Sequence, residues 1–137
     1  MPPISVMLKP ASSLCNLQCR YCFYHSLAGQ RESYSHGKMS LGTAEEVIVK
    51  AFDYSRGADV YFAFQGGEPL LAGLNFFREF VEIAGRRNLY RSRICYSMQT
   101  NGILLDEDWC RFLKAHRFLV GLSLDGYPAL HDRYRRD

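Results

Sequence analysis

Short apolar runs alternate with amphipathic segments along this chain. Four runs have the length and the β-branched or aromatic content of strands, and they cover residues 4–9, 60–64, 93–98 and 118–124. Three segments between them place apolar residues on one side of a helix, from about 43 to 57, from 75 to 87 and from 106 onward. Thr43, with Glu46 three residues later, predicts a capping box, and Gly57 predicts where that helix ends. Asp106 predicts the cap of the last helix.

The order of these elements predicts an α/β fold with parallel strands. A helix separates each pair of successive strands, which is the arrangement of right-handed βαβ units. The run at 118–124 is almost wholly apolar, which predicts a strand buried on both faces. Polar or glycine-rich residues follow the end of every strand, and parallel α/β folds bind ligands at that edge of the sheet. We therefore expect these four segments to meet at one site.

Composition and charge narrow the class of protein. The chain has 137 residues, of which 47% are apolar and 23% are charged, as in folded soluble proteins rather than disordered ones. A net charge of +3 is too small to indicate nucleic-acid binding. The first apolar run is interrupted by Lys9 and Pro10, so it is too short for a signal peptide or a membrane span. A cytoplasmic location is the resulting expectation.

Three of the five cysteines lie within eight residues, as Cys15, Cys19 and Cys22. An odd, clustered set is not typical of a secreted disulfide scaffold, and thiolates favour iron–sulfur clusters, zinc or Cu(I). Three thiolates would leave one iron of a cubane cluster open, which suits a site that binds a further ligand and disfavours a simple electron carrier. His25 would complete a Cys3His zinc site instead, and three buried free cysteines are a third possibility. Isolated Cys95 and Cys110 are expected to be small buried core residues.

The cysteine spacing, with Tyr21 before the third cysteine, resembles the signature of radical S-adenosylmethionine (SAM) enzymes. Further blocks resemble the anaerobic sulfatase-maturating enzymes across essentially the whole chain. These blocks are residues 9–13, 22–25, 64–69, 99–102 and 121–126. Leu70 stands where that family would have threonine. The resemblance implies a partial (β/α) barrel of the radical SAM type, of which residues 1–137 would be the N-terminal part with about the first four βα units.

The resemblance also implies the cofactors and the residues that hold them. The three cysteines would hold a [4Fe–4S] cluster, whose open iron binds SAM, and reduction would give a 5′-deoxyadenosyl radical. Gly66, Gly67 and Glu68 would meet the methionine ammonium of SAM. Tyr21 would lie near the adenine, Ser123 near the ribose or methionine portion, and Arg135 at the SAM carboxylate. Further residues are expected to line the mouth of this cofactor site, although no individual role is assigned to them. They are Tyr24, Gln65, Gln99, Asn101 and Asp125.

The implied reaction is the oxidation of a cysteine or serine of a sulfatase to formylglycine. An electron donor such as a flavodoxin or a ferredoxin would reduce the cluster, and neither nucleic acid nor a membrane would take part. No catalytic residue falls within this chain, because the family places its base and auxiliary clusters beyond residue 137. We therefore expect a fragment that is inactive alone. A radical SAM maturase of another peptide and a non-catalytic zinc module remain alternatives.

Overall fold

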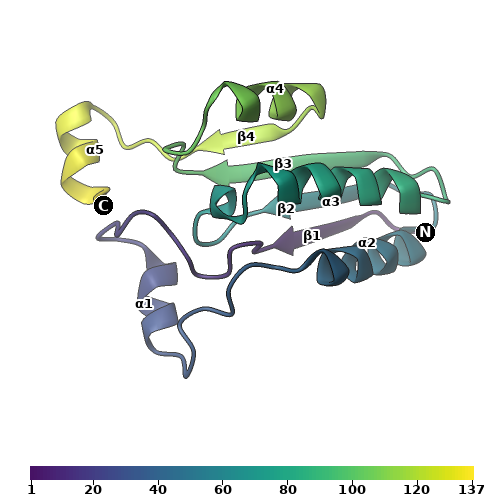
Figure 1. Ribbon diagram of the computed structural model, residues 1–137, viewed down its shortest axis with the longest axis horizontal. Helices are drawn as coiled ribbons and strands as arrows, with labels where there is room; N and C mark the ends of the chain where they lie inside the picture. The colour runs from purple at the N-terminus through teal and green to yellow at the C-terminus, as the bar shows by residue number, and fades with distance from the viewer.

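Four parallel strands form one sheet in the order in which they occur in the sequence. The computed structural model describes residues 1–137 (Figure 1). Its strands are β1 (Ile4–Leu8), β2 (Val60–Phe64), β3 (Ile94–Thr100) and β4 (Leu119–Leu122), and the sheet order is β1-β2-β3-β4. Val60 of β2 lies opposite Ile4 on one side and Ile94 on the other. The α/β fold with parallel strands is therefore confirmed.

Two long helices pack together and cover one face of this sheet, and shorter helices lie around it (Figure 1). The helices are α1 (Phe23–Gly29), α2 (Leu41–Ser55), the 3₁₀ helix η1 (Pro69–Ala72), α3 (Leu74–Arg87), α4 (Glu107–Ala115) and α5 (Pro128–Tyr134). The long pair is α2 and α3, whereas α1 and α5 lie beyond the carboxyl ends of the strands. None of the helices has the length and apolar character that crossing a membrane requires.

The hydrophobic core lies between the sheet and the helices α2, α3 and α4, each of which contributes buried side chains to it. Along β2, Val60, Phe62 and Phe64 are buried, while Tyr61 is exposed on the opposite face, because successive side chains of a strand point to opposite sides. The Phe62 ring contacts those of Phe52 at 6.3 Å and Phe80 at 5.2 Å between centroids. The core thus lies on one face of the sheet. The other face of the sheet, and the end at which the carboxyl ends of the strands meet, are free for a site.

Several element boundaries differ from the sequence-based expectation. Ser40, not Thr43, caps α2, because its hydroxyl accepts a hydrogen bond from the Thr43 amide at 3.1 Å. The helix ends in the left-handed conformation at Arg56, one residue before Gly57. Helices α1 and α5 were not expected, and each has only seven residues, too few for a clear apolar period.

The prediction that the last strand is buried on both faces is wrong. Leu119 of β4 is 75% exposed and Leu122 is 54% exposed. The cause is that β4 pairs only with β3 and forms the edge of the sheet. The two isolated cysteines are also not core residues. Cys95 is half-buried in β3, and Cys110 is exposed on α4, whose buried residues are Trp109, Phe112 and Leu113.

Candidate functional site

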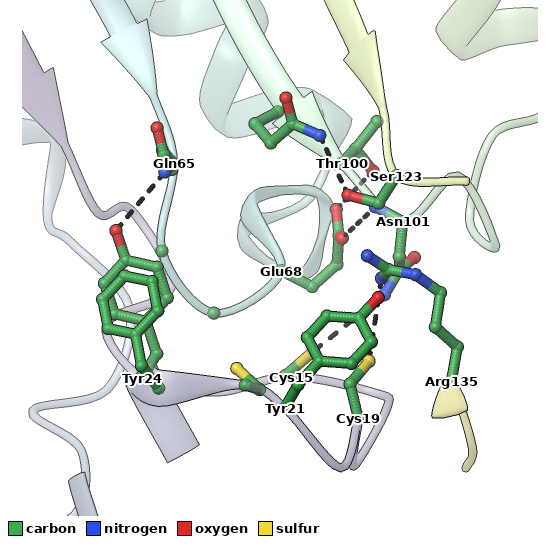
Figure 2. A pocket seen from close by; sticks show the side chains of 15 residues that line it. Cys15, Cys19, Tyr21, Tyr24, Gln65, Glu68, Thr100, Asn101, Ser123 and Arg135 are labelled. Atoms are coloured by element: carbon green, nitrogen blue, oxygen red, sulfur yellow. Dashed lines mark hydrogen bonds between the residues drawn. The ribbon is translucent and has the colours of Figure 1, made fainter. Parts of the chain in front are cut away.

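The segments that follow the four strands surround one cavity of about 270 Å³ (Figure 2). All nine residues that the sequence nominates as cluster or cofactor ligands line it. The lining consists of Cys15, Cys19, Tyr21, Cys22, Phe23, Tyr24, Gln65, Gly66, Gly67, Glu68, Gln99, Thr100, Asn101, Ser123 and Arg135. The strand polarity explains this convergence, since the carboxyl ends of parallel strands meet at one edge. Contacts of single residues with a cofactor stay predictions.

The cysteine loop begins directly after β1 and is built from consecutive tight turns. The amides of Ser12 and Leu14 each donate to a carbonyl three residues earlier, at 3.0 Å, and Ser12 has a positive φ of 56°. The Cys22 amide donates to the Cys19 carbonyl at 3.1 Å, and Cys22 immediately precedes α1. These turns bring the three cysteines, which are separated by three and two residues, to the same side of the cavity.

Hydrogen-bond donors point at two of the three sulfurs. The Leu17 amide lies 3.5 Å from Cys15 Sγ, and Asn101 Nδ2 lies 3.9 Å from the same atom. Arg135 Nη1 lies 3.7 Å from Cys19 Sγ. Burial raises the pKa of the Cys15 and Cys19 thiols. Donors aimed at sulfur stabilise thiolates bound to iron, so this set of residues fits an iron–sulfur cluster.

His25 does not join the cysteines. Its Nδ1 lies 2.9 Å from the Tyr34 hydroxyl, and the imidazole is not part of the cavity lining. No three His, Cys, Asp or Glu side chains lie close enough together to hold a single metal ion. The fourth ligand of the proposed Cys3His zinc site is therefore engaged elsewhere in this structure.

The glycines after β2 bring their backbone close to the cysteine loop. Gly66 and Gly67 both have a positive φ, of 92° and 58°. A Cβ on Gly67 would lie 2.3 Å from the Leu14 carbonyl oxygen, and the next amide, that of Glu68, donates to this same oxygen at 2.8 Å. Glycine is therefore required at position 67 both by conformation and by space.

Glu68 has a role that sequence reasoning missed. Its side chain is buried, with 1% exposure, and accepts hydrogen bonds from Thr100 Oγ1 at 2.6 Å, the Asn101 amide at 2.8 Å and the Leu70 amide at 3.1 Å. The carboxylate thus ties the loop after β2 to the end of β3. The sequence feature that could have indicated this role of Glu68 is the polar pair Thr100-Asn101, which follows a buried strand. Its predicted contact with the SAM ammonium stays a prediction.

Polar side chains of the neighbouring loops pair across the mouth of the cavity, as Figure 2 shows. Gln99 Nε2 donates to Ser123 Oγ at 2.9 Å, and Gln65 Nε2 donates to the Tyr24 hydroxyl at 3.4 Å. The Lys9 ammonium lies 4.2 Å from the centre of the Tyr24 ring. These contacts fix the orientation of groups that project toward a bound ligand.

Asp125 does not line the cavity, contrary to expectation, but binds two residues that do. Its Oδ2 accepts hydrogen bonds from the Tyr21 hydroxyl and, at 3.0 Å, from Arg135 Nε. The hydrogen bond from Tyr21, followed by the charge of Arg135, lowers the pKa of the Asp125 carboxyl. Burial and the same hydrogen bond raise the pKa of Tyr21 to about 12. Two cavity-lining side chains are therefore held by one carboxylate.

Comparison with known proteins connects this geometry to an enzyme family. A family model of the radical SAM superfamily matches residues 10–137. The chain is 46% identical over its whole length to a cysteine-type anaerobic sulfatase-maturating enzyme of Clostridium novyi, of which it covers 36%. It is 37% identical, over 98% of its length, to a serine-type enzyme of that name from Klebsiella aerogenes, of which it covers 33%.

Solved structures give the same result. Native anSMEcpe with bound AdoMet, which is SAM, matches 99% of this chain with a TM-score of 0.91 and 46% identity. Native anSMEcpe with bound AdoMet and Cp18Cys peptide matches with a TM-score of 0.88 and 45% identity. The chain covers 36% and 35% of these structures, so it spans about a third of the relatives it matches.

Proposed function

This chain belongs to the radical SAM superfamily, and on that premise we propose that residues 1–137 form the N-terminal part of the radical SAM domain of an anaerobic sulfatase-maturating enzyme. The observation that carries the proposal is the position of Cys15, Cys19 and Cys22 on a single cavity with Gly66 and Gly67. The 46% identity to cysteine-type sulfatase-maturating enzymes supports the choice within the superfamily.

The residues of the cavity fit a [4Fe–4S] cluster and SAM. Cys15, Cys19 and Cys22 would bind three irons, and the fourth iron would remain for the amino and carboxylate groups of SAM. When bound, this pair supplies a 5′-deoxyadenosyl radical that takes a hydrogen atom from the Cβ of the target residue. The positive φ of Gly66 and Gly67 would let backbone groups approach the methionine end of SAM.

The remaining side chains of this chain orient the ligand and shield it from water. Ser123 is held by Gln99 and presents its hydroxyl to the cavity. Tyr21, Phe23 and Tyr24 interleave with Cys22 and cover the mouth with aromatic rings. Exclusion of water protects a radical from side reactions, so we assign to these rings a protective role.

We propose that the substrate of the enzyme is a sulfatase peptide. We favour cysteine over serine as its target residue. The identity is 46–47% to the cysteine-type relatives and 35–37% to the serine-type relatives, which supports cysteine. A flavodoxin or a ferredoxin would supply the electron. The reaction would take place in the cytoplasm, where thiols stay reduced.

Peptide modification tests this proposal. The full-length protein, reconstituted anaerobically with iron and sulfide, is incubated with SAM, a reductant and two sulfatase-motif peptides that differ only in a cysteine or a serine at the target position. Formylglycine, detected by mass spectrometry on the cysteine peptide, is the expected product. Cleavage of SAM without change in either peptide would instead favour a maturase of another peptide.

Replacement of His25 by alanine is expected to leave the cluster intact, because His25 contacts Tyr34 and lies outside the cavity. Iron content and the change of the EPR spectrum on addition of SAM should both match those of the unchanged protein. Zinc and iron are measured by atomic emission in both proteins. A colourless protein that holds one zinc ion and loses it in His25→Ala would establish the zinc-module alternative.

A further inference from the structure

The second half of the cysteine loop is attached to the end of the chain after β4. Two backbone hydrogen bonds make part of this link, from the Gln18 amide to the Arg136 carbonyl at 2.5 Å and from the Arg20 amide to the Tyr134 carbonyl at 2.9 Å. The Tyr21 and Tyr134 rings lie 6.3 Å apart between centroids. The loop that carries Cys19 thus depends for its position on a segment more than a hundred residues away.

One carboxylate forms the side-chain part of this link. Asp125 Oδ2 accepts from the Tyr21 hydroxyl in the cysteine loop and from Arg135 Nε at the end of α5. The Asp125 backbone amide donates separately to His131 Nδ1 at 3.3 Å, which attaches the backbone of Asp125 to α5. Asp125 is therefore the residue through which both partners are fixed.

The consequence of this arrangement is a defined position for the Arg135 guanidinium. Its side chain is only 13% exposed, its Cζ lies 5.4 Å from the centre of the Tyr21 ring, and its Nη1 lies 3.7 Å from Cys19 Sγ. A positive charge and an N–H donor close to a ligand sulfur favour the reduced, more negative form of an iron–sulfur cluster.

We propose that Asp125 is a positioning residue, which holds the cysteine loop against the segment after β4 and holds the Arg135 guanidinium beside the Cys19 sulfur. The reduction potential of the cluster then depends on Asp125 through Arg135. This inference rests on the proposed function, because it assumes that Cys19 binds the cluster. It gives Arg135 a role that is separate from the predicted contact with the SAM carboxylate.

The chain offers a matched control for Asp125. Asp59 Oδ2 also accepts from an arginine Nε, that of Arg93 at 3.2 Å, and from a tyrosine hydroxyl, that of Tyr61 at 3.1 Å. Asp59 directly precedes β2, at the edge of the sheet opposite to the cysteines. Asp59→Asn thus removes a carboxylate charge from an arginine and a tyrosine, as Asp125→Asn does, but at a position far from the cysteine loop.

Amide hydrogen exchange tests the attachment of the loop. In the full-length protein without cluster, Asp125→Asn should speed exchange at the amides of Gln18 and Arg20 by roughly tenfold or more, because their opening no longer requires breaking the side-chain link. Asp59→Asn should leave these rates unchanged. Should Asp125→Asn fold poorly, Tyr21→Phe removes one of the two hydrogen bonds and should give a smaller acceleration at the same amides. Unchanged rates in every foldable variant would overturn the proposal.

A double-mutant cycle on the reduction potential tests the positioning of Arg135. The potential is measured by EPR-monitored titration of the reconstituted protein without SAM. Arg135→Gln should move the reduction potential to a more negative value when Asp125 is present. In the Asp125→Asn background, the same substitution should shift the potential by much less. Equal shifts in both backgrounds would show that Asp125 does not position Arg135. Absence of a cluster in the unchanged protein would refute the proposed function, whereas the exchange experiment would still test the loop attachment.

Discussion

Replacement of Cys19 by serine is expected to reduce SAM cleavage to background. The reason is that Cys15, Cys19 and Cys22 line the cavity and are the proposed ligands of the cluster, and a hydroxyl is a poor substitute for a thiolate on iron. The measurement is 5′-deoxyadenosine formed by the reduced, reconstituted full-length protein. The EPR spectrum of the Cys19→Ser protein should also no longer change on addition of SAM. This measurement distinguishes the SAM-binding cluster from any other cluster.

Cys110→Ser and Cys95→Ser are the controls for this experiment. Cys110 is exposed on α4, and Cys95 is half-buried in β3, and neither lines the cavity. Both variants should cleave SAM at the rate of the unchanged protein. SAM cleavage that survives Cys19→Ser would contradict the assignment of the cluster to this loop.

Gly67→Ala is expected to weaken SAM binding severely and to lower the free energy of unfolding by about 2 kcal/mol or more. The new methyl group would lie 2.3 Å from the Leu14 carbonyl oxygen and 2.9 Å from the Ser12 carbonyl oxygen, and both belong to the backbone. Relief of this clash requires that the loop after β2 and the cysteine loop move apart. Binding is measured by equilibrium dialysis with SAM, and stability by urea denaturation.

Gly73→Ala separates the clash from the conformational strain. Gly73 also has a positive φ, of 92°, but nothing lies within 4 Å of the position that a Cβ would occupy. The strain should lower stability, whereas the variant should still bind SAM, because the new methyl group meets no neighbour within 4 Å. Equal loss of SAM binding in Gly67→Ala and Gly73→Ala would mean that close approach to Leu14 is not what position 67 requires.

The sequence predicted the fold well where the signal was local. The run at 60–64 coincides with β2, and the Asp106 side chain caps α4 by accepting from the Trp109 amide at 2.9 Å. Errors arose where tertiary context decides. An apolar strand at an edge has the same sequence pattern as a strand at the centre, so the exposure of β4 could not be read from its residues. The short α5 has no buried residue and therefore no apolar period.

The site could be predicted as a set of residues but not as a network. Residue spacing and the family resemblance nominated nine of the fifteen residues that line the cavity as ligands of a cluster or cofactor. All but Arg135 lie in the cysteine motif or in a short, recognisable block. The partners of Glu68 and Asp125 were not predicted. Glu68 binds Thr100, which is 32 residues away, and Asp125 binds Tyr21, which is 104 residues away. Pairings of this range depend on how the loops approach in space, which no single segment encodes.

The one-sided core has a consequence for how this sequence can vary. Val60, Phe62 and Phe64 lie under the helices, whereas Tyr61 and Ala63, between them, face away. In a saturation mutagenesis experiment, substitutions at the first set should reduce the abundance of the protein in the cell. Substitutions at the second set should leave abundance largely unchanged. Tolerance along β2 should therefore alternate with each residue, because only every second side chain contributes to the core.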